Sequence, residues 1–480
     1  MSLLSVLALI AICIWVGRGS LIHLCREGVP TERNLRWIVF LTAGLVVLHL
    51  TMTTLDTMGV PWSPLTIGIP LGIIALLGWS TSTKAQGVSP LLPNPSSRLG
   101  WGDLLGFGGV AAMAVAGARF WSTNPDFVYH WGVKGHRFFL ARGFDYDFLI
   151  QPWNRLAHPD YPFLLPEIFA ATSFLRGGFD ESAMLLWSPV FWGLGLVAGR
   201  QALVRAGASF TATQGFLAIG SLGIAAFGIG HPLSGGPDLM IAAALLLGAV
   251  ALLQPVGKVD SSGLSWEEGA TGRDLLITLA ACLAAISKVE GLILAVLLLS
   301  AHGLRERLWQ PTKALPDSVR QEAVPQQRWT IGRWGIGRWP LGRWILLALP
   351  LALCTLPWLV QCFRHDLFGR PNGGPFNPAN AALIFPAIWQ TLRNPHWHGL
   401  ALASLAVAPF LLLQRHLRWL VGVCLVQLLF YIYVYFTDLQ AAHIHVLTSF
   451  ARILCHLVPA LVLAASLASD RWVRRNGLSD

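Results

Sequence analysis

Residues 1–19 have the sequence MSLLSVLALIAICIWVGRG, an apolar run whose first charged side chain is Arg18. No basic segment precedes the run and no Ala-x-Ala site follows it, so we expect a retained membrane helix and not a cleaved signal peptide. A helix needs about 20 apolar residues to cross a bilayer. Comparable runs recur along the chain and predict thirteen spans. They lie at approximately 2–17, 37–54, 64–82, 103–119, 181–199, 211–230, 238–254, 274–287, 290–304, 344–361, 399–414, 419–436 and 449–468. The pair at 274–304 is either two short crossings or one kinked helix.

The composition supports the same fold class. Of the 480 residues, 54% are apolar and 12% are charged, and the mean hydropathy is +0.57. The charged fraction of an ordinary soluble protein is about twice as large. The formal net charge of +10 lies mostly in short segments between apolar runs, which favours contact with an anionic bilayer surface over binding of nucleic acid. We therefore expect an all-α integral membrane protein of the plasma (inner) membrane.

The positions of Lys and Arg predict the orientation. Connections rich in these residues alternate with connections around Asp56, Asp238 and Asp438 that contain none. Short basic loops stay in the cytoplasm, so we expect the N-terminus outside and the C-terminus inside. The basic segment 303–343, which contains three Gly-Arg-Trp repeats, is then cytoplasmic. The expected outer segments are 120–180, 231–238, 362–398 and 437–448.

Nine of the fourteen His residues fall in these four outer segments. Segments that only connect helices do not need so many titratable groups, so we expect the chemistry outside. The nine are His130, His136, His158, His231, His365, His396, His398, His443 and His445.

The first outer segment begins NPDFVYHWGVKGHR, residues 124–137. At about 100° per residue, Asp126, His130, Lys134 and Arg137 share one helical face. One carboxylate beside several cations suits a reaction in which a base activates a nucleophile while a phosphate leaves. An equally open alternative is an Asp near a helix N-terminus, with the basic residues facing lipid headgroups.

Farther along, residues 158–166 have the sequence HPDYPFLLP. Three prolines within this stretch predict a rigid, extended path, followed by an interfacial helix to Leu175. A structural role is the commoner one for polar residues in such a turn, so His158 and Asp160 remain open between scaffold and catalysis.

Five motifs in order resemble the GT-C superfamily of polytopic glycosyltransferases. These are bacterial relatives of the dolichyl-phosphate-mannose protein mannosyltransferases and of the lipid A aminoarabinose transferase. The motifs lie at 126–134 (Asp, then Tyr-His-Trp-x-x-Lys), 158–166, 235–238 (Gly-Gly-Pro-Asp), 287–291 (Ser-Lys-Val-Glu-Gly) and 448–454 (Thr-Ser-Phe-Ala-Arg-Ile-Leu). The resemblance covers roughly residues 120–460. Val289 stands where the family usually has Asn, and His130 interrupts the usual aromatic run.

The resemblance implies a catalytic module at 103–468, preceded by extra helices at 1–102 and followed by a cytoplasmic tail at 469–480. Such enzymes pass a sugar from a polyprenyl-phosphate donor to a glycan, lipid or protein acceptor at the outer face, with inversion. By carry-over, Asp126 is the general base. The donor phosphate would be bound by Lys134, Arg452 and Lys288. The pocket would be shaped by His130, Arg137, His158, Asp160, Tyr161, Asp238 and Glu290. Asp238 and Glu290 also have a structural interpretation, as helix caps or as partners of a nearby Lys.

His443 and His445 suggest a metal, but the sequence offers no third ligand. We therefore expect no metal, and no cofactor beyond the lipid-linked donor. The main alternative function is a multi-pass transporter or lipid flippase, which predicts ionisable residues at mid-membrane and an internal repeat. Neither is clear, since only His49, His302 and His456 fall within spans. A non-catalytic scaffold leaves the clustered outer His, Asp and Lys residues unexplained.

Overall fold

The computed structural model describes residues 1–24, 32–82, 99–119, 125–226, 235–254, 266–308, 341–368, 374–394, 399–437 and 442–477. Every regular element within these ranges is a helix. Seven helices are long and apolar enough to span a membrane, which confirms an all-α membrane protein. They cover Ser2–Leu21, Asn34–Thr57, Trp101–Arg119, Glu181–Arg205, Gly342–Arg364, Arg418–Phe436 and Ala442–Arg475.

The described part of each of the thirteen predicted spans lies almost entirely in helix. Besides the seven long helices, three are shorter apolar helices, at Pro64–Gly78, Asp238–Leu253 and Leu400–Leu413. The count of thirteen crossings stays a prediction. The helices of the bundle are α1 (Ser2–Leu24), α2 (Arg33–Thr57), α3 (Pro64–Ser82), α4 (Trp101–Arg119), α9 (Trp187–Arg205), α10 (Phe210–Ala226), α11 (Asp238–Leu253), α12 (Trp266–Ser287), α13 (Val289–Leu308), α15 (Leu341–Arg364), α17 (Leu400–Leu413), α18 (Arg418–Phe436) and α19 (Ala442–Arg475).

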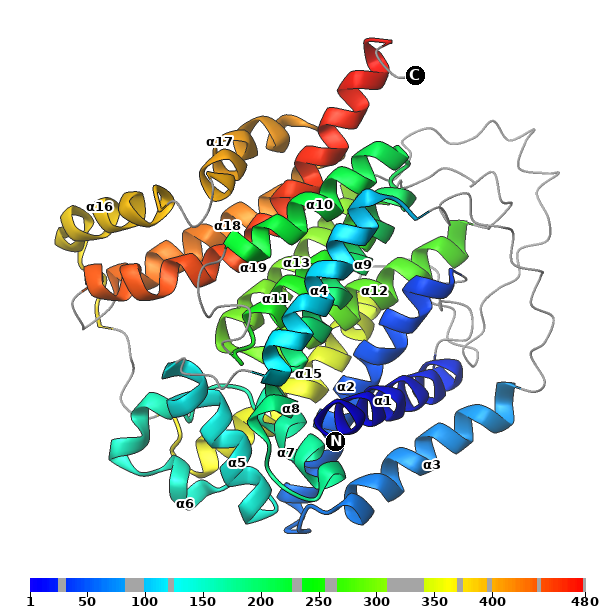
Figure 1. Ribbon diagram of the computed structural model, residues 1–480, viewed down its shortest axis with the longest axis vertical. Coiled ribbons are helices and arrows are strands. Elements are labelled where there is room, and N and C mark those ends of the chain that lie inside the picture. The colour runs from blue at the N-terminus through cyan, green and yellow to red at the C-terminus, as the bar shows by residue number, and fades with distance from the viewer. Residues whose placement is uncertain are drawn as a thin grey trace.

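Helix α11 lies at the centre of the bundle. Its sequence, DLMIAAALLLGAVALL, is apolar on every side after Asp238, and all 16 residues are buried. A helix without a polar face is stable only when it is surrounded by other apolar surface. It packs against α9, α12 and α19 (Figure 1). The first residue of α11 is thereby held at one end of the bundle core.

The uncertain pair at 274–304 forms two helices, α12 and α13, separated at Lys288. The two helices pack against each other. A Cβ atom at Gly291 would lie 1.9 Å from the carbonyl oxygen of Ala284, so only glycine allows this approach. The interpretation as two helices is therefore confirmed, and Lys288 lies at the turn between them.

Residues 125–185, which we call the cap, cover one end of the bundle (Figure 1). Asp56 at the end of α2 accepts hydrogen bonds from the backbone N–H of Phe144 (2.8 Å) and the hydroxyl of Tyr146 (2.7 Å). These bonds tie the cap to the bundle. The cap consists of a π-helix η2 (Phe127–Trp131), α5 (Gly132–Ala141), α6 (Tyr146–Leu149), the 3-10 helix η3 (Pro152–Ala157), α7 (Leu164–Arg176) and α8 (Glu181–Leu185).

The predicted proline-rich path has no helix from His158 to Phe163, and the helix expected after it is α7. Ten consecutive residues of α7, Leu164–Ser173, are buried against the rest of the protein. This helix packs on α1, α2 and α5 and so joins the cap to the bundle.

The predicted outer segment 362–398 contains a further helix, α16 (Ala381–Leu392), which packs against α19. Helix α17 then packs against α18 and α19. The two helices follow each other along this pair (Figure 1). Part of the expected loop is therefore built into the bundle, because its sequence, AALIFPAIWQTL, is largely apolar.

The third Gly-Arg-Trp repeat opens α15 at the end of the bundle far from the turn at Lys288. The Nε atom of Arg343 donates to Asp274 of α12 at 2.6 Å. A Cβ atom at Gly303 of α13 would lie 2.1 Å from the ring of Trp344. This repeat therefore anchors α15 to α12 and α13. The repeats at 332–334 and 337–339 lie outside the described residues.

Candidate functional site

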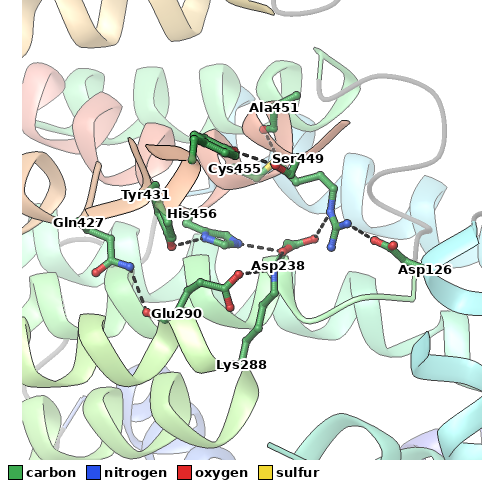
Figure 2. Close-up of polar contacts among 12 residues, drawn as sticks. Asp126, Asp238, Lys288, Glu290, Gln427, Tyr431, Ser449, Ala451, Cys455 and His456 are labelled. Carbon is green, nitrogen blue, oxygen red and sulfur yellow. Dashed lines mark hydrogen bonds and ion pairs between the residues drawn. The ribbon is translucent and has the colours of Figure 1, made fainter. Parts of the chain in front are cut away.

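Four segments far apart in the sequence meet where the cap joins the bundle (Figure 2). They contribute what we call the ion cluster, which consists of Asp126, Asp238, Lys288, Glu290 and Arg452. The contributing segments are the start of the cap, the start of α11, the α12–α13 turn and the middle of α19. Five predicted site residues are thus linked by a continuous chain of ion pairs.

Asp238 is the best-anchored member of the ion cluster. Its Oδ2 atom accepts from the Nε of Arg452 at 3.0 Å, and its Oδ1 atom accepts from the Nε2 of His456 at 2.9 Å. The amine of Lys288 lies 3.7 Å from Oδ1. Only 9% of this side chain is exposed, and a buried carboxylate requires such partners because its desolvation is costly. Its position in the first turn of α11 adds the favourable helix dipole.

Arg452 bridges two carboxylates. Its Nε atom contacts Asp238, and its Nη1 atom pairs with Asp126. The guanidinium therefore joins the two acids. The exposed fractions of the side chains rise from 9% for Asp238 through 16% for Arg452 to 30% for Asp126. Asp126 is therefore the most accessible of the three groups.

Lys288 connects the ion cluster to the cap. Its amine lies 3.0 Å from Oε1 of Glu290 and 5.9 Å from the ring centre of Tyr161. Asp238 and Glu290 both pair with this lysine, as expected if these acids are partners of a nearby Lys. The backbone carbonyl of Glu290 also accepts from the side chain of Gln427 at 3.0 Å.

Gly235 lies where the Gly-Gly-Pro-Asp motif approaches the cap. Its φ of +62° is in the left-handed region, and a Cβ atom there would lie 2.2 Å from the ring of Phe127. Both the backbone conformation and the close ring contact therefore require glycine. Phe127, the residue after Asp126, therefore packs against the segment that carries Asp238.

Three members of the polar network, Gln427, Tyr431 and His456, were not predicted as site residues. The Nδ1 atom of His456 lies 2.7 Å from the hydroxyl of Tyr431, and its Nε2 atom donates to Asp238. The neutral ring therefore accepts from the tyrosine and donates to the carboxylate. The missed signal is the four-residue spacing of Gln427 and Tyr431 on α18, matched by Arg452 and His456 on α19, because such pairs share a helical face.

Aromatic and imidazole rings of the cap lie beside the ion cluster. The ring of His130 stacks on Trp131 with centroids 3.9 Å apart, and it lies 4.7 Å from the ring of His158. The ring of Tyr161 lies 4.6 Å from that of His158. Burial, followed by the charge of Lys134, holds the pKa of His130 well below its usual value. The same two causes lower the pKa of His158 to about 4, so both rings are neutral at pH 7.

Burial shifts the pKa of two acidic groups of the cap, Asp160 and Tyr161. Burial raises the pKa of the Asp160 carboxyl, although the charge of Lys134 opposes the shift. Burial also raises the pKa of Tyr161, and the neighbouring charge of Glu290 adds to it. The turn at 158–161 is thus a partly desolvated wall of the site.

Three buried polar atoms beside the ion cluster have no hydrogen-bond partner among the described residues. They are Nε2 of His130, Nδ1 of His158 and Oε2 of Glu290. Buried polar groups in folded proteins almost always have partners. Unsatisfied atoms from three separate segments are therefore available to a polar ligand or to water.

Lys134 is completely buried inside the cap. Its amine donates to the carbonyl of His158 at 3.2 Å and lies 4.6 Å from the ring centre of Trp131. Burial lowers the pKa of Lys134 to about 7, against the opposing charge of Asp160. The structure thus places this predicted phosphate ligand in the cap wall, engaged with the turn at His158.

The prediction of one shared helical face is wrong for Arg137. Its guanidinium pairs with Asp145 at 2.6 Å, and 44% of its side chain is exposed. The reason is local: residues 127–131 form a π-helix, in which the N–H of Gly132 donates to the carbonyl of Phe127, five residues earlier. This wider turn shifts the angular register on which the prediction relied.

Metal ligation finds no support in the described part of the chain. It contains no group of three or more His, Cys, Asp or Glu side chains arranged to hold a metal ion. His445 at the start of α19 packs instead against the ring of Tyr435, with centroids 5.1 Å apart. His231, His396 and His398 lie outside the described residues.

A groove of about 660 Å³ lies elsewhere, between α10, α17 and α19. On α19 it runs from Val462 to Arg474, beyond the position of Arg452. Its lining is mostly apolar and includes none of the ion cluster. The ion cluster and this groove are therefore separate features.

No family model, no curated protein and no solved structure matches this chain. A functional assignment must therefore rest on the chemistry of the chain's own residues.

Proposed function

We propose that the protein transfers a sugar from a polyprenyl-phosphate donor to an acceptor hydroxyl at the extracytoplasmic membrane face, with inversion. One observation carries the proposal. Asp126, Asp238, Lys288 and Arg452, which come from motifs scattered along the chain, lie in a single cluster under the cap. Two cations for the leaving phosphate and an accessible carboxylate for the proton are the groups that this reaction needs.

The roles follow from the charges. The acceptor oxygen attacks the anomeric carbon, the bond from that carbon to the phosphate oxygen breaks, and the electron pair leaves with the phosphate. Asp126, the most exposed acid among the paired carboxylates of Arg452, accepts the proton of the attacking hydroxyl. Arg452 and Lys288 stabilise the negative charge on the leaving phosphate.

The unsatisfied polar atoms supply hydrogen-bonding groups for the sugar ring. His130, His158 and Glu290 present one such atom each. A neutral imidazole can donate to or accept from a sugar hydroxyl, and a carboxylate oxygen accepts from one. A polyhydroxylated ring would satisfy these atoms together, whereas an apolar ligand would leave them unpaired.

The test is single-turnover transfer of labelled sugar from a purified polyprenyl-phosphate donor by protein in nanodiscs. Asp126→Asn keeps the size of the side chain but removes its basicity. It should lower the rate about 10²-fold or more. Asp147→Asn, which changes an exposed acid of the same cap, should leave the rate within a few-fold. Equal rates for the two variants would exclude Asp126 as the base.

A second candidate, proton-coupled transport, is favoured by one buried pair. His49 of α2 and Glu167 of α7 are 2.7 Å apart and completely buried, and the other ring nitrogen of His49 donates to the carbonyl of Cys354 at 3.0 Å. Ionisable residues within membrane helices often mark transport pathways. Flux of labelled donor into proteoliposomes without acceptor, abolished by Glu167→Gln, would support transport. Sugar transfer that survives Glu167→Gln would assign the pair to packing.

A further inference from the structure

We propose that Arg452 is an anion site that Asp126 occupies in the resting protein, and that the phosphate of the donor displaces Asp126 from it. The inference rests on the proposed function, because the donor phosphate comes from that reaction. It goes further because one ion pair, between Asp126 and Arg452, then couples binding of the donor to release of the base.

The two acids that contact Arg452 are not held equally. Asp238 is 9% exposed and also contacts His456 and Lys288. Separating it from Arg452 would leave a charge poorly compensated in a buried environment, which is costly. Asp126 is 30% exposed, so water can compensate its charge when it leaves. An incoming anion therefore displaces Asp126 and leaves Asp238 in place.

The chemistry of the guanidinium suits this exchange. Its planar donors bind carboxylate and phosphate oxygens in the same geometry. Since Nε of Arg452 already donates to Asp238, the Nη side is the part that Asp126 and a phosphate would share. A phosphodiester carries one negative charge, like the carboxylate, so the exchange leaves Arg452 with two anionic partners throughout.

Displacement has a catalytic consequence. While Asp126 is paired with Arg452, a carboxylate oxygen is occupied by a cationic donor. Once the donor phosphate takes this place, the oxygen can accept the proton of the acceptor hydroxyl. Binding of a donor thus releases the carboxylate oxygen of the base that Arg452 holds in the resting protein.

Replacement of a residue in a binding site usually lowers the affinity for the ligand, but this arrangement predicts that replacement of Asp126 raises it. Asp126→Asn removes the competing negative charge, so Arg452 should bind a phosphate more tightly. The probe is a short-chain polyprenyl methyl phosphate, a phosphodiester without sugar, titrated at constant ionic strength into wild-type protein and variants in the same detergent. We expect about a 10-fold lower Kd for Asp126→Asn than for the wild type, which corresponds to about 1.4 kcal/mol.

The control variants separate this exchange from general electrostatics. Asp147→Asn removes one negative charge from an exposed position of the cap and should leave the Kd unchanged. Arg452→Gln should weaken binding, and adding Asp126→Asn to it should restore nothing. Thermal unfolding of each variant in the same detergent checks that it is folded.

The outcomes are distinct. A Kd for Asp126→Asn equal to or higher than that of the wild type overturns the exchange, as does a gain that persists without Arg452. Absence of binding to the wild type and to Asp126→Asn overturns it as well. A gain in affinity in a protein that transfers no sugar would refute the proposed function and leave the anion site standing.

Discussion

The amine of Lys134 lies 3.2 Å from the backbone carbonyl oxygen of His158, inside the cap. The residue that presents this carbonyl has a φ of +46°, an uncommon conformation for a side chain other than glycine. A cation that holds such a turn positions the wall formed by His158 and Tyr161. Lys134 therefore contacts the turn of the cap, whereas Arg452 and Lys288 are themselves members of the ion cluster.

Replacing Lys134 by Met should change the pH dependence of stability. The pKa of Lys134 is about 7 in the folded protein, below its ordinary value of 10.5. Below pH 7 both states bind the proton and the buried cation is fully destabilising. From pH 7 to about 10.5 only the unfolded state retains the proton, so the wild type gains stability as the pH rises. The Tm of Lys134→Met relative to the wild type should therefore be highest below pH 7 and fall toward pH 10.

Intrinsic Trp fluorescence during heating in detergent measures this difference. Arg137→Met removes a 44% exposed cation from the same helix and should show no such trend. A Tm difference for Lys134→Met that is constant from pH 6 to pH 9 would contradict the assignment.

Gly291→Ala should disrupt the α12–α13 pair. The new methyl group would lie 1.9 Å from the backbone oxygen of Ala284, which cannot move without displacing α12. We expect a loss of at least the ~1–3 kcal/mol typical of overpacking, seen as a lower Tm or reduced yield of folded protein. Gly108→Ala in α4 meets nothing within 4 Å and should be neutral or slightly stabilising. Equal effects at the two positions would disprove this packing argument.

Tyr431→Phe should destabilise the protein by about 1–3 kcal/mol, because Nδ1 of His456 loses its buried donor. Tyr433→Phe on the same helix removes the hydroxyl from a side chain that is 52% exposed, and it should have almost no effect. Denaturant unfolding in matched detergent compares the two. A similar change in both variants would mean that the Tyr431–His456 bond contributes nothing.

His130→Phe should weaken recognition of the sugar while preserving the ring stacked on Trp131. The variant leaves a sugar hydroxyl without its buried partner, so KM for the donor should rise about 10-fold or more. His136→Phe is the matched control, because that ring stacks on Phe179 elsewhere on the cap. Transfer kinetics that are identical in the two variants would remove His130 from the sugar site.

The predicted orientation places the cap outside and the basic segment 303–343 in the cytoplasm. A membrane-impermeant thiol reagent should label Ile150→Cys in intact cells, since this cap residue is 51% exposed. Pro325→Cys should react only after the membrane is opened. The reverse pattern would place the ion cluster at the cytoplasmic end and exclude a donor presented outside.

The helices of the bundle were predictable because run length and hydropathy are local properties, and each span coincides with a helix. The packing of α16 on α19 was not, since a Pro-containing apolar stretch inside a long polar segment is compatible with a loop. The convergence of Asp126, Asp238 and Arg452 is a tertiary property. It was expected only through the order of the motifs.

The polar stripe of α18 shows where local information was present but weak. Gln427 and Tyr431 occur in the apolar helix RWLVGVCLVQLLFYIYVYF, where single polar residues have little influence on hydropathy. Their meaning depends on their partners in other helices, Glu290 and His456. The prediction for Arg137 was wrong for another reason. It assumed a regular rotation per residue across a segment that forms a π-helix.

The π-helix at 127–131 holds one residue more than an α-helical turn would, and Asp126 is the residue directly before it. Deletion of a single residue here would let the chain wind as an α-helix continuous with α5. Because an ordinary turn then replaces the wider one, the residues on its two sides would keep nearly the same rotation about the helix axis, and Asp126 would still face Arg452. Deletion of a residue within α5 would instead rotate everything before it by about 100° relative to the rest of α5. Natural variants of this protein should therefore accept a one-residue deletion between Asp126 and Gly132 far more readily than one within α5.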